Sequence, residues 1–216
     1  FWILEGRFSM ARSVEYLESL VRELSKLSTE VEWVEFKCNN KDPERIAKYI
    51  SGLSNAATLA EKTKAYLVWG IQDDTHEIVG TDFEYRKMKR GNEELEAWLA
   101  RMINPKINFR FYEVQMGADQ DENAIYVTLI EIPAAETEPT RFEKTAYIRV
   151  GTNLKPMVDY KEKEAQLWAL FNTTPYELRI AFSNGSEEDI TSLLDYTKYY
   201  DKLEFPIPGN REKVLE

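Results

Sequence analysis

The periodicity of apolar residues changes several times along this chain, and that feature constrains its fold more than any other. Apolar positions recur at steps of three and four over residues 10–28, which predicts an amphipathic helix. Residues 31–37 and 124–132 instead alternate apolar and polar side chains, as strands with one buried face do. Residues 65–71 form an apolar run, which is typical of a fully buried strand. Because helical and strand segments are interspersed and several strands follow one another, the sequence predicts an α+β fold.

The remaining elements are expected to complete a mixed, mostly antiparallel sheet with packed helices. Asp42 followed by Pro43 is typical of a helix start, because aspartate caps the first turn and proline fits its first position. Asn92 is expected to cap another helix, which ends before Pro105. Further strands are expected over residues 76–80, 108–115 and 146–150, the last of them being the final strand, and a further helix beyond Lys161.

The same patterns suggest four parts along the chain. Residues 1–9 precede Met10, which looks like a native start, so we interpret them as vector-derived. Residues 10–28 are the N-terminal helix, and residues 29–160 the main domain. Residues 161–216 are then a small helical C-terminal extension. Its end resembles a helix cut off at the first turn, which indicates that further C-terminal domains of a longer protein are missing.

Composition limits the class of protein. The chain has 216 residues, of which 43% are hydrophobic, enough for one full core and a smaller appended unit. No run approaches the ~18 consecutive apolar residues of a membrane span. Cys38 and His76 are the only residues of their types, which argues against a disulfide or zinc site and fits a reducing cytoplasm. The glycine motifs of nucleotide-binding loops and the Gly-x-Ser-x-Gly elbow of hydrolases are also missing.

The net charge of −10 bears on nucleic-acid binding. Proteins that bind nucleic acid usually carry a basic face, so this acidic chain would need a local patch. The best candidate is a short basic segment, for which a solvated loop or helix start is the alternative. It contains Arg86, Lys87, Lys89 and Arg90. A looser second group consists of Arg141, Lys144, Arg149 and Lys155.

Three carboxylates flank the predicted buried strands. Glu30 and Glu35 lie at the two ends of the strand over residues 31–37, and Asp73 follows the next apolar strand. Carboxylates brought together in this way could hold a hard divalent ion such as Mg²⁺ or Mn²⁺, or could be solvated strand ends. Glu32 competes with Glu30 for this role. The two share one strand face, whereas Glu35 lies on the opposite face unless Glu30 precedes the regular strand or a bulge intervenes.

Five stretches, in this order, resemble the Schlafen AlbA-like domain, a divergent AlbA domain of bacterial regulators and animal Schlafens. They are residues 30–37, which contain Glu-x4-Glu-Phe-Lys, and residues 49–56, 67–74, 77–81 and 147–152. The resemblance covers residues from about 29 to 155. One segment departs from it, because residues 57–64 replace the Thr-x-Gly-Gly turn of many members with what we expect to be a longer loop without glycine.

The resemblance implies two functions. Bacterial members are described as DNA-binding or transcriptional-regulator modules, which implies a nucleic-acid-binding module, with DNA or RNA as its partner, in a larger bacterial regulatory protein. Some Schlafens are metal-dependent endoribonucleases whose acidic triad matches Glu30, Glu35 and Asp73, which implies a Mg²⁺ or Mn²⁺ site. Lys37 could then contact the scissile phosphate. A third alternative, from another class, is a protein-interaction or homo-oligomerisation domain. The sequence leaves open whether the protein is an enzyme.

Overall fold

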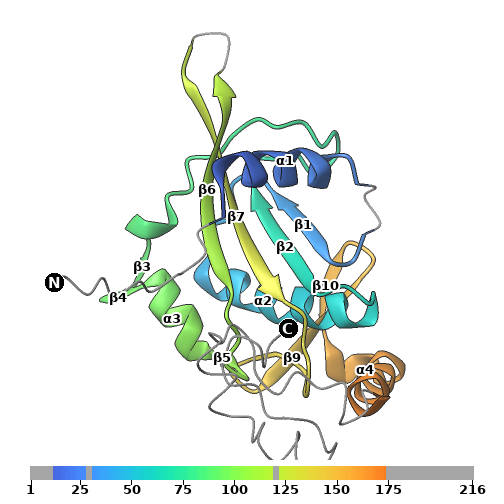
Figure 1. Ribbon diagram of the computed structural model, residues 1–216. Coiled ribbons are helices and arrows are strands. Elements are labelled where there is room, and N and C mark those ends of the chain that lie inside the picture. The colour runs from blue at the N-terminus through green and yellow to red at the C-terminus, as the bar shows by residue number, and fades with distance from the viewer. Residues whose placement is uncertain (1–11, 28–30, 119–121, 174–216) are drawn as a thin grey trace, which may run out of the picture. The chain divides into compact units, whose positions relative to one another are not determined.

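The computed structural model describes residues 12–27, 31–118 and 122–173, and these adopt an α+β fold (Figure 1). The central sheet has the strand order β1-β2-β7-β6. Strand β1 (Val34–Lys37) runs parallel to β2 (Lys64–Trp69). Strand β7 (Ala124–Pro133) is antiparallel to both of its neighbours, β2 and β6 (Arg110–Ala118). The predicted mixed, mostly antiparallel sheet with packed helices is therefore confirmed.

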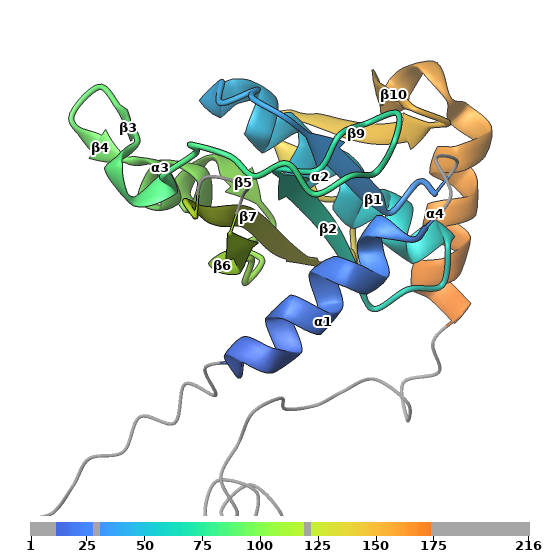
Figure 2. The ribbon, with the colours of Figure 1, turned by 90° about the horizontal axis from the view of Figure 1, so that it is seen from above.

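The two faces of this sheet carry different helices. Helix α1 (Val14–Ser25) lies against one face and α2 (Pro43–Leu59) against the other (Figure 2). Val34 and Phe36 of β1 pack in the same apolar cluster as the buried residues of α1. Since successive side chains of a strand point to opposite faces, Glu35 and Lys37 project towards the face covered by α2.

Helix α2 is also packed against a second sheet, with the strand order β10-β9-β8-β5. These strands are β5 (Ile103–Asn104), β8 (Arg141–Phe142), β9 (Thr145–Val150) and β10 (Asn153–Pro156). The buried Asn55 amide joins the layers, because it donates to the carbonyls of Thr140 and Tyr147 at 2.9 and 2.8 Å. Ser51 adds hydrogen bonds to the backbone of the same two residues at 2.6 and 3.0 Å. The Ser-Gly-Leu-Ser-Asn stretch of α2 thus attaches the second sheet.

The smaller elements lie around these two sheets. A hairpin of β3 (Lys89–Arg90) and β4 (Glu93–Glu94) precedes α3 (Leu95–Met102). Helix α4 (Lys161–Thr173) packs Leu167 and Phe171 into a cluster with Ile148 of β9. Two short 3₁₀ turns, Tyr85–Lys87 and Met157–Asp159, complete the described elements. Within the described ranges, no helix has the length and apolar character needed to cross a membrane.

The structure corrects four local predictions. Helix α3 begins after Glu94 rather than at Asn92, because the residues before it form the β3–β4 hairpin. Residues 76–80 contribute only a single bridge between Ile78 and Ile71. Strand β10 follows β9, so residues 146–150 are not the last strand. Residues 57–64 are not a long loop, since α2 continues to Leu59. Elements predicted within residues 174–216 lie outside the described residues.

Gly70, directly after β2, lies so close to the backbone of Gly80 that a substitution can test this contact. Its φ is +99°, and an added Cβ would lie 2.9 Å from the carbonyl carbon of Gly80. Gly70→Ala is therefore expected to lower the free energy of unfolding by about 2 kcal/mol or more, because strain and a backbone clash add together. Denaturant unfolding measures the loss. Gly91→Ala is the control, because Gly91 also has a positive φ but has open space around it. Equal losses in the two variants would contradict the clash.

Candidate functional site

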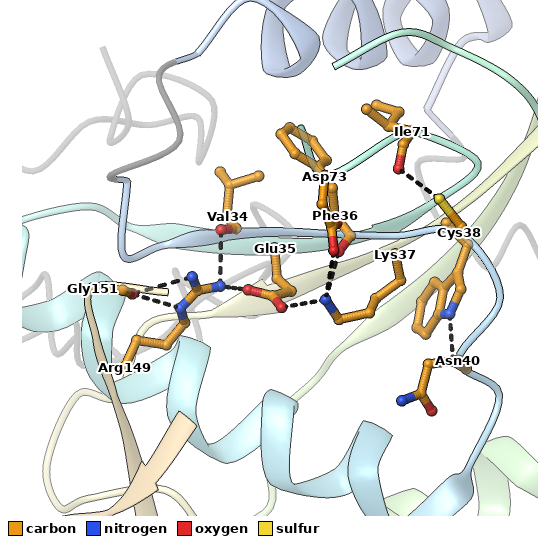
Figure 3. Close-up of polar contacts among 11 residues, drawn as sticks. Val34, Glu35, Phe36, Lys37, Cys38, Asn40, Ile71, Asp73, Arg149 and Gly151 are labelled. Carbon is orange, nitrogen blue, oxygen red and sulfur yellow. Dashed lines mark hydrogen bonds and ion pairs between the residues drawn. The ribbon is translucent and has the colours of Figure 1, made fainter. Parts of the chain in front are cut away.

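The carboxyl ends of β1 and β2 bring two of the predicted carboxylates together at Lys37 (Figure 3). The ammonium nitrogen of Lys37 lies 2.5 Å from Glu35 Oε1 and 3.4 Å from Asp73 Oδ2. These oxygens are therefore at most about 6 Å apart, and two oxygens that share one Mg²⁺ lie at most about 4 Å apart, so sharing an ion requires an approach closer than this bound. The parallel pairing of β1 with β2 causes this convergence, because both strands then end at the same edge of the sheet.

Arg149 of β9 holds the other side of Glu35. Its guanidinium forms an ion pair with Glu35 Oε2 and donates to the Val34 carbonyl at 3.2 Å. It also donates to the Gly151 carbonyl from two nitrogens, at 3.3 and 3.2 Å. Arg149 is only 3% exposed, and this burial lowers its pKa to about 10. It is still protonated at neutral pH, so it balances the charge of the buried Glu35.

Glu32 is held by a different set of groups near Arg149. Its carboxylate lies 2.9 Å from the ammonium of Lys163 on α4 and accepts the Gly151 N–H at 3.1 Å. The charge of Glu32 also raises the pKa of Arg149, which opposes the larger lowering caused by burial. Glu32 is therefore engaged by α4 and the β9–β10 turn. Glu30, for which it was the sequence-based alternative, lies outside the described residues.

The donors at this site are of the type that Mg²⁺ and Mn²⁺ prefer. Glu35 and Asp73 supply two carboxylates, and both oxygens of Glu35 already contact cations, one from Lys37 and one from Arg149. Over residues 12–27, 31–118 and 122–173, no group of three or more acidic, histidine or cysteine side chains could hold a metal ion. These two carboxylates are donors of the kind a hard cation takes, and the third carboxylate predicted from the sequence, Glu30, lies outside the described residues.

Arg45 and Lys48, two cations of α2, lie close to the site and were not predicted from the sequence. Arg45 lies over the ring of Tyr49, 5.9 Å from its centroid, and Lys37 of β1 lies over the same ring at 5.5 Å. Lys48, one turn further along α2, lies 5.9 Å from the centroid of Tyr147. In the described part of the chain, neither Arg45 nor Lys48 forms an ion pair with a carboxylate. Their spacing of three residues on the predicted helix was the available signal, because it places both on one helical face.

The basic segment predicted from the sequence lies elsewhere, around the β3–β4 hairpin. All four of its cations are exposed, but glutamates from neighbouring segments lie beside three of them. Lys87 forms an ion pair with Glu84, and Lys89 lies opposite Glu94 across the hairpin. Arg90 lies 2.5 Å from Glu44 in the first turn of α2. These carboxylates offset much of the positive charge of the segment.

Two cations of the second predicted group, Arg149 and Lys155, differ in exposure. Arg149 is directed inwards to Glu35, whereas Lys155 on β10 is exposed. Lys155 lies opposite Ile148 in the β9–β10 pair. The structure thus brings Glu35, Lys37, Asp73 and Arg149 into one cluster. The hairpin cations and Lys155 are not part of the contacts of that cluster.

Comparison with known proteins identifies the domain. A family model described as "Schlafen, AlbA_2" matches residues 30–158, which is more than half of the chain. The chain belongs to the Schlafen AlbA_2 family. This family indicates a nucleic-acid-related domain. Within the matched region of the Schlafen AlbA_2 domain lie Glu35, Lys37, Asp73 and Arg149.

The Schlafen AlbA_2 domain was also compared with solved structures and curated sequences. The crystal structure of the DIP2311 protein from Corynebacterium diphtheriae is similar, with 18% identity and a TM-score of 0.39. The match covers 66% of this chain and 26% of that chain, so this chain spans about a quarter of the length of that protein. The comparison with curated proteins found no match.

Proposed function

We propose that this Schlafen AlbA_2 domain is a nucleic-acid-binding module, with DNA as its first ligand, in a larger bacterial regulatory protein. The observation that carries this proposal is the pairing of Lys37 and Arg45 over one ring, that of Tyr49. Lys48 continues the row of cations along α2. Lys37 is shared with Glu35 and Asp73, whereas Arg45 and Lys48 have no carboxylate partner among the described residues. Cations of this second kind suit a phosphate backbone, and the neighbouring tyrosine rings limit the motion of their side chains.

This row of cations also explains how a chain with a net charge of −10 could bind nucleic acid. An acidic protein repels nucleic acid at long range, so binding requires cations that are not already neutralised by neighbours. The cations around the β3–β4 hairpin are partly neutralised, because Glu84, Glu94 and Glu44 lie beside them. Arg45 and Lys48 therefore meet the requirement for free cations better. We therefore place the phosphate contacts along α2 and its junction with β1.

The salt dependence of DNA binding tests this proposal. Arg45→Ala/Lys48→Ala is expected to weaken binding and to lower the slope of log K against log salt by about 1.4 on single strands, since two phosphate contacts are lost. Fluorescence anisotropy with a labelled oligonucleotide measures both quantities. The comparison variant replaces the four sequence-predicted cations by alanine, and they are Arg86, Lys87, Lys89 and Arg90. A lower slope in that variant alone would move the site to the hairpin, and no binding by wild type would contradict the proposal.

A second candidate function is metal-dependent cleavage of RNA, which the convergence of Glu35 and Asp73 favours. These carboxylates, with Glu30, would hold Mg²⁺ or Mn²⁺. When bound, the ion would neutralise charge on the scissile phosphate and activate a water. Lys37 would contribute a positive charge to the same phosphate, and Arg149 would hold the Glu35 carboxylate in place through their ion pair.

Dependence on the ion tests this second candidate. Cleavage of tRNA by the purified protein is expected in Mn²⁺ or Mg²⁺ and is expected to disappear in excess chelator. Gel analysis of the digestion products provides the measurement. Restoring Mn²⁺ after chelation should restore cleavage, which distinguishes loss of the ion from irreversible damage. Cleavage that persists in chelator would exclude the metal-dependent mechanism.

A further inference from the structure

An open groove of about 700 Å³, none of whose lining residues belongs to the Lys37 cluster, has no part in the contacts described above. Asn39 and Lys41, which follow β1, line one part of it. Residues 79–82 and the first residues of β7 line the rest. The segment containing residues 79–82 is fixed to β7, because the Thr81 N–H donates to the Tyr126 carbonyl at 2.8 Å. Two of the segments that line the groove, residues 79–82 and β7, are therefore held together by a backbone hydrogen bond.

Gly80 permits the close approach that shapes this groove. An added Cβ would lie 3.1 Å from Ile125 Cγ2 and 3.4 Å from the Tyr126 carbonyl oxygen, and φ is +81°. Glycine therefore allows the segment to lie directly against β7. Gly80 belongs to one of the stretches that resemble the Schlafen AlbA-like domain, and the Lys37 cluster does not account for its presence there.

Tyr126 projects from the same face of the sheet as Lys37. Val127 packs in the cluster under α1, so its neighbours Tyr126 and Thr128 point to the opposite face. Lys37, Trp69 and Thr128 form one row across β1, β2 and β7. Tyr126 lies two residues before Thr128 on β7, and β7 is two strands away from β1. Ordinary sheet spacings therefore place the positions of Lys37 and Tyr126 about 12 Å apart. A single strand of about two to four nucleotides spans such a distance.

The groove contains an exposed aromatic ring and one pair of opposite charges that offset each other. Tyr126 is 42% exposed and is one of six exposed large hydrophobic side chains among the described residues. Lys41 lies 2.6 Å from Asp82, and this contact lowers the pKa of Asp82, so the two charges are paired. A neutral, planar and polar group fits a surface of this kind better than a second phosphate does. Asn39 adds an exposed amide that can hydrogen-bond the edge of such a group.

We infer that this groove binds an unpaired nucleobase of single-stranded nucleic acid whose backbone lies at Lys37, with Tyr126 as the stacking platform and Asn39 as a hydrogen-bonding group. The inference rests on the proposed nucleic-acid-binding function and adds to it a preference for unpaired strands. Bases in a duplex are already stacked and paired, so they are not free to occupy the groove. A single strand should therefore bind more tightly than a duplex of the same sequence.

The inference is tested by comparing the binding of a complete oligonucleotide with that of an abasic one. Tyr126→Ala is expected to weaken binding of a labelled single-stranded oligonucleotide by roughly tenfold or more, the range for loss of one base–aromatic stack. Tyr126→Phe should retain most of the affinity, because the ring remains. Tyr16→Ala is the matched control, since Tyr16 is 41% exposed but lies on α1, across the sheet. An abasic oligonucleotide should bind wild type and Tyr126→Ala equally.

The outcomes separate this inference from the proposed function. Wild-type binding with no difference between wild type and Tyr126→Ala would overturn the groove and leave the nucleic-acid-binding function in place. Equal affinity of wild type for single strands and duplexes would also overturn it. An equal loss for the abasic and the complete strand would show that Tyr126 acts on the backbone or on folding, and would overturn the base pocket. Failure of the wild type to bind any oligonucleotide would overturn both proposals.

Discussion

Arg149→Met is expected to lower the free energy of unfolding by about 3–5 kcal/mol, a large part of the stability of a typical domain. The variant leaves Glu35 buried with only one of its two cationic partners, since Lys37 would remain. It also removes the donors to the Val34 and Gly151 carbonyls. Denaturant unfolding, with the slope checked for a change in the denatured state, measures the difference.

Two further variants isolate the cause of this loss. Lys155→Met removes an exposed cation from the neighbouring strand and is expected to change stability by less than about 0.5 kcal/mol. The double variant Glu35→Leu/Arg149→Met removes both buried charges, so it should be more stable than Arg149→Met alone. If Arg149→Met has no more effect than Lys155→Met, the buried ion pair does not hold β9 to β1.

Asp73→Asn is expected to reduce metal-dependent cleavage by roughly a thousandfold or more, if the second candidate function is correct. The amide keeps the shape of the side chain but loses the charge that would hold the ion. Its effect on folding should be small, because the Asp73 side chain is 57% exposed and its ion pair with Lys37 is long, at 3.4 Å. Rates of tRNA and DNA digestion in Mn²⁺, for wild type and variant in parallel, provide the measurement.

Asp74→Asn is the matched control for that experiment, because Asp74 is the exposed neighbour in the same turn and is not in contact with Lys37 within the described structure. It should retain activity close to that of wild type. Equal cleavage by wild type and Asp73→Asn would point to a contaminating nuclease. Absence of cleavage by wild type on tRNA and on single- and double-stranded DNA would leave the binding module as the supported function.

Local features of the sequence were sufficient to place most of the elements. Asp42 caps α2 as predicted, because its carboxylate accepts the Arg45 N–H at 3.1 Å within the same turn. The prediction for Asn92 was wrong, because residues 89 and 90 pair with residues 93 and 94 and the helix begins only after that hairpin. A capping residue can be recognised from one turn of chain, whereas a competing hairpin depends on the pairing of two segments.

The candidate site shows the same division. The sequence placed Glu35 and Asp73 at strand ends, and the register of β1 on β2 brought them to one lysine. The sequence could not place Arg149, which was expected as a surface cation and is buried against Glu35. Its partner comes from a strand more than a hundred residues away, and no local pattern records which face of β9 meets β1.

The sequence by itself therefore determined the kinds of element, their approximate bounds and the carboxylates at the ends of two strands, because these depend on periodicity and on contacts within a few residues. Only the tertiary structure decided which charges are paired. It placed Arg149 in the interior, offset the hairpin cations with glutamates, and left Arg45 and Lys48 beside tyrosine rings. Burial and pairing depend on distances between segments that the chain brings together only when both sheets pack on α2.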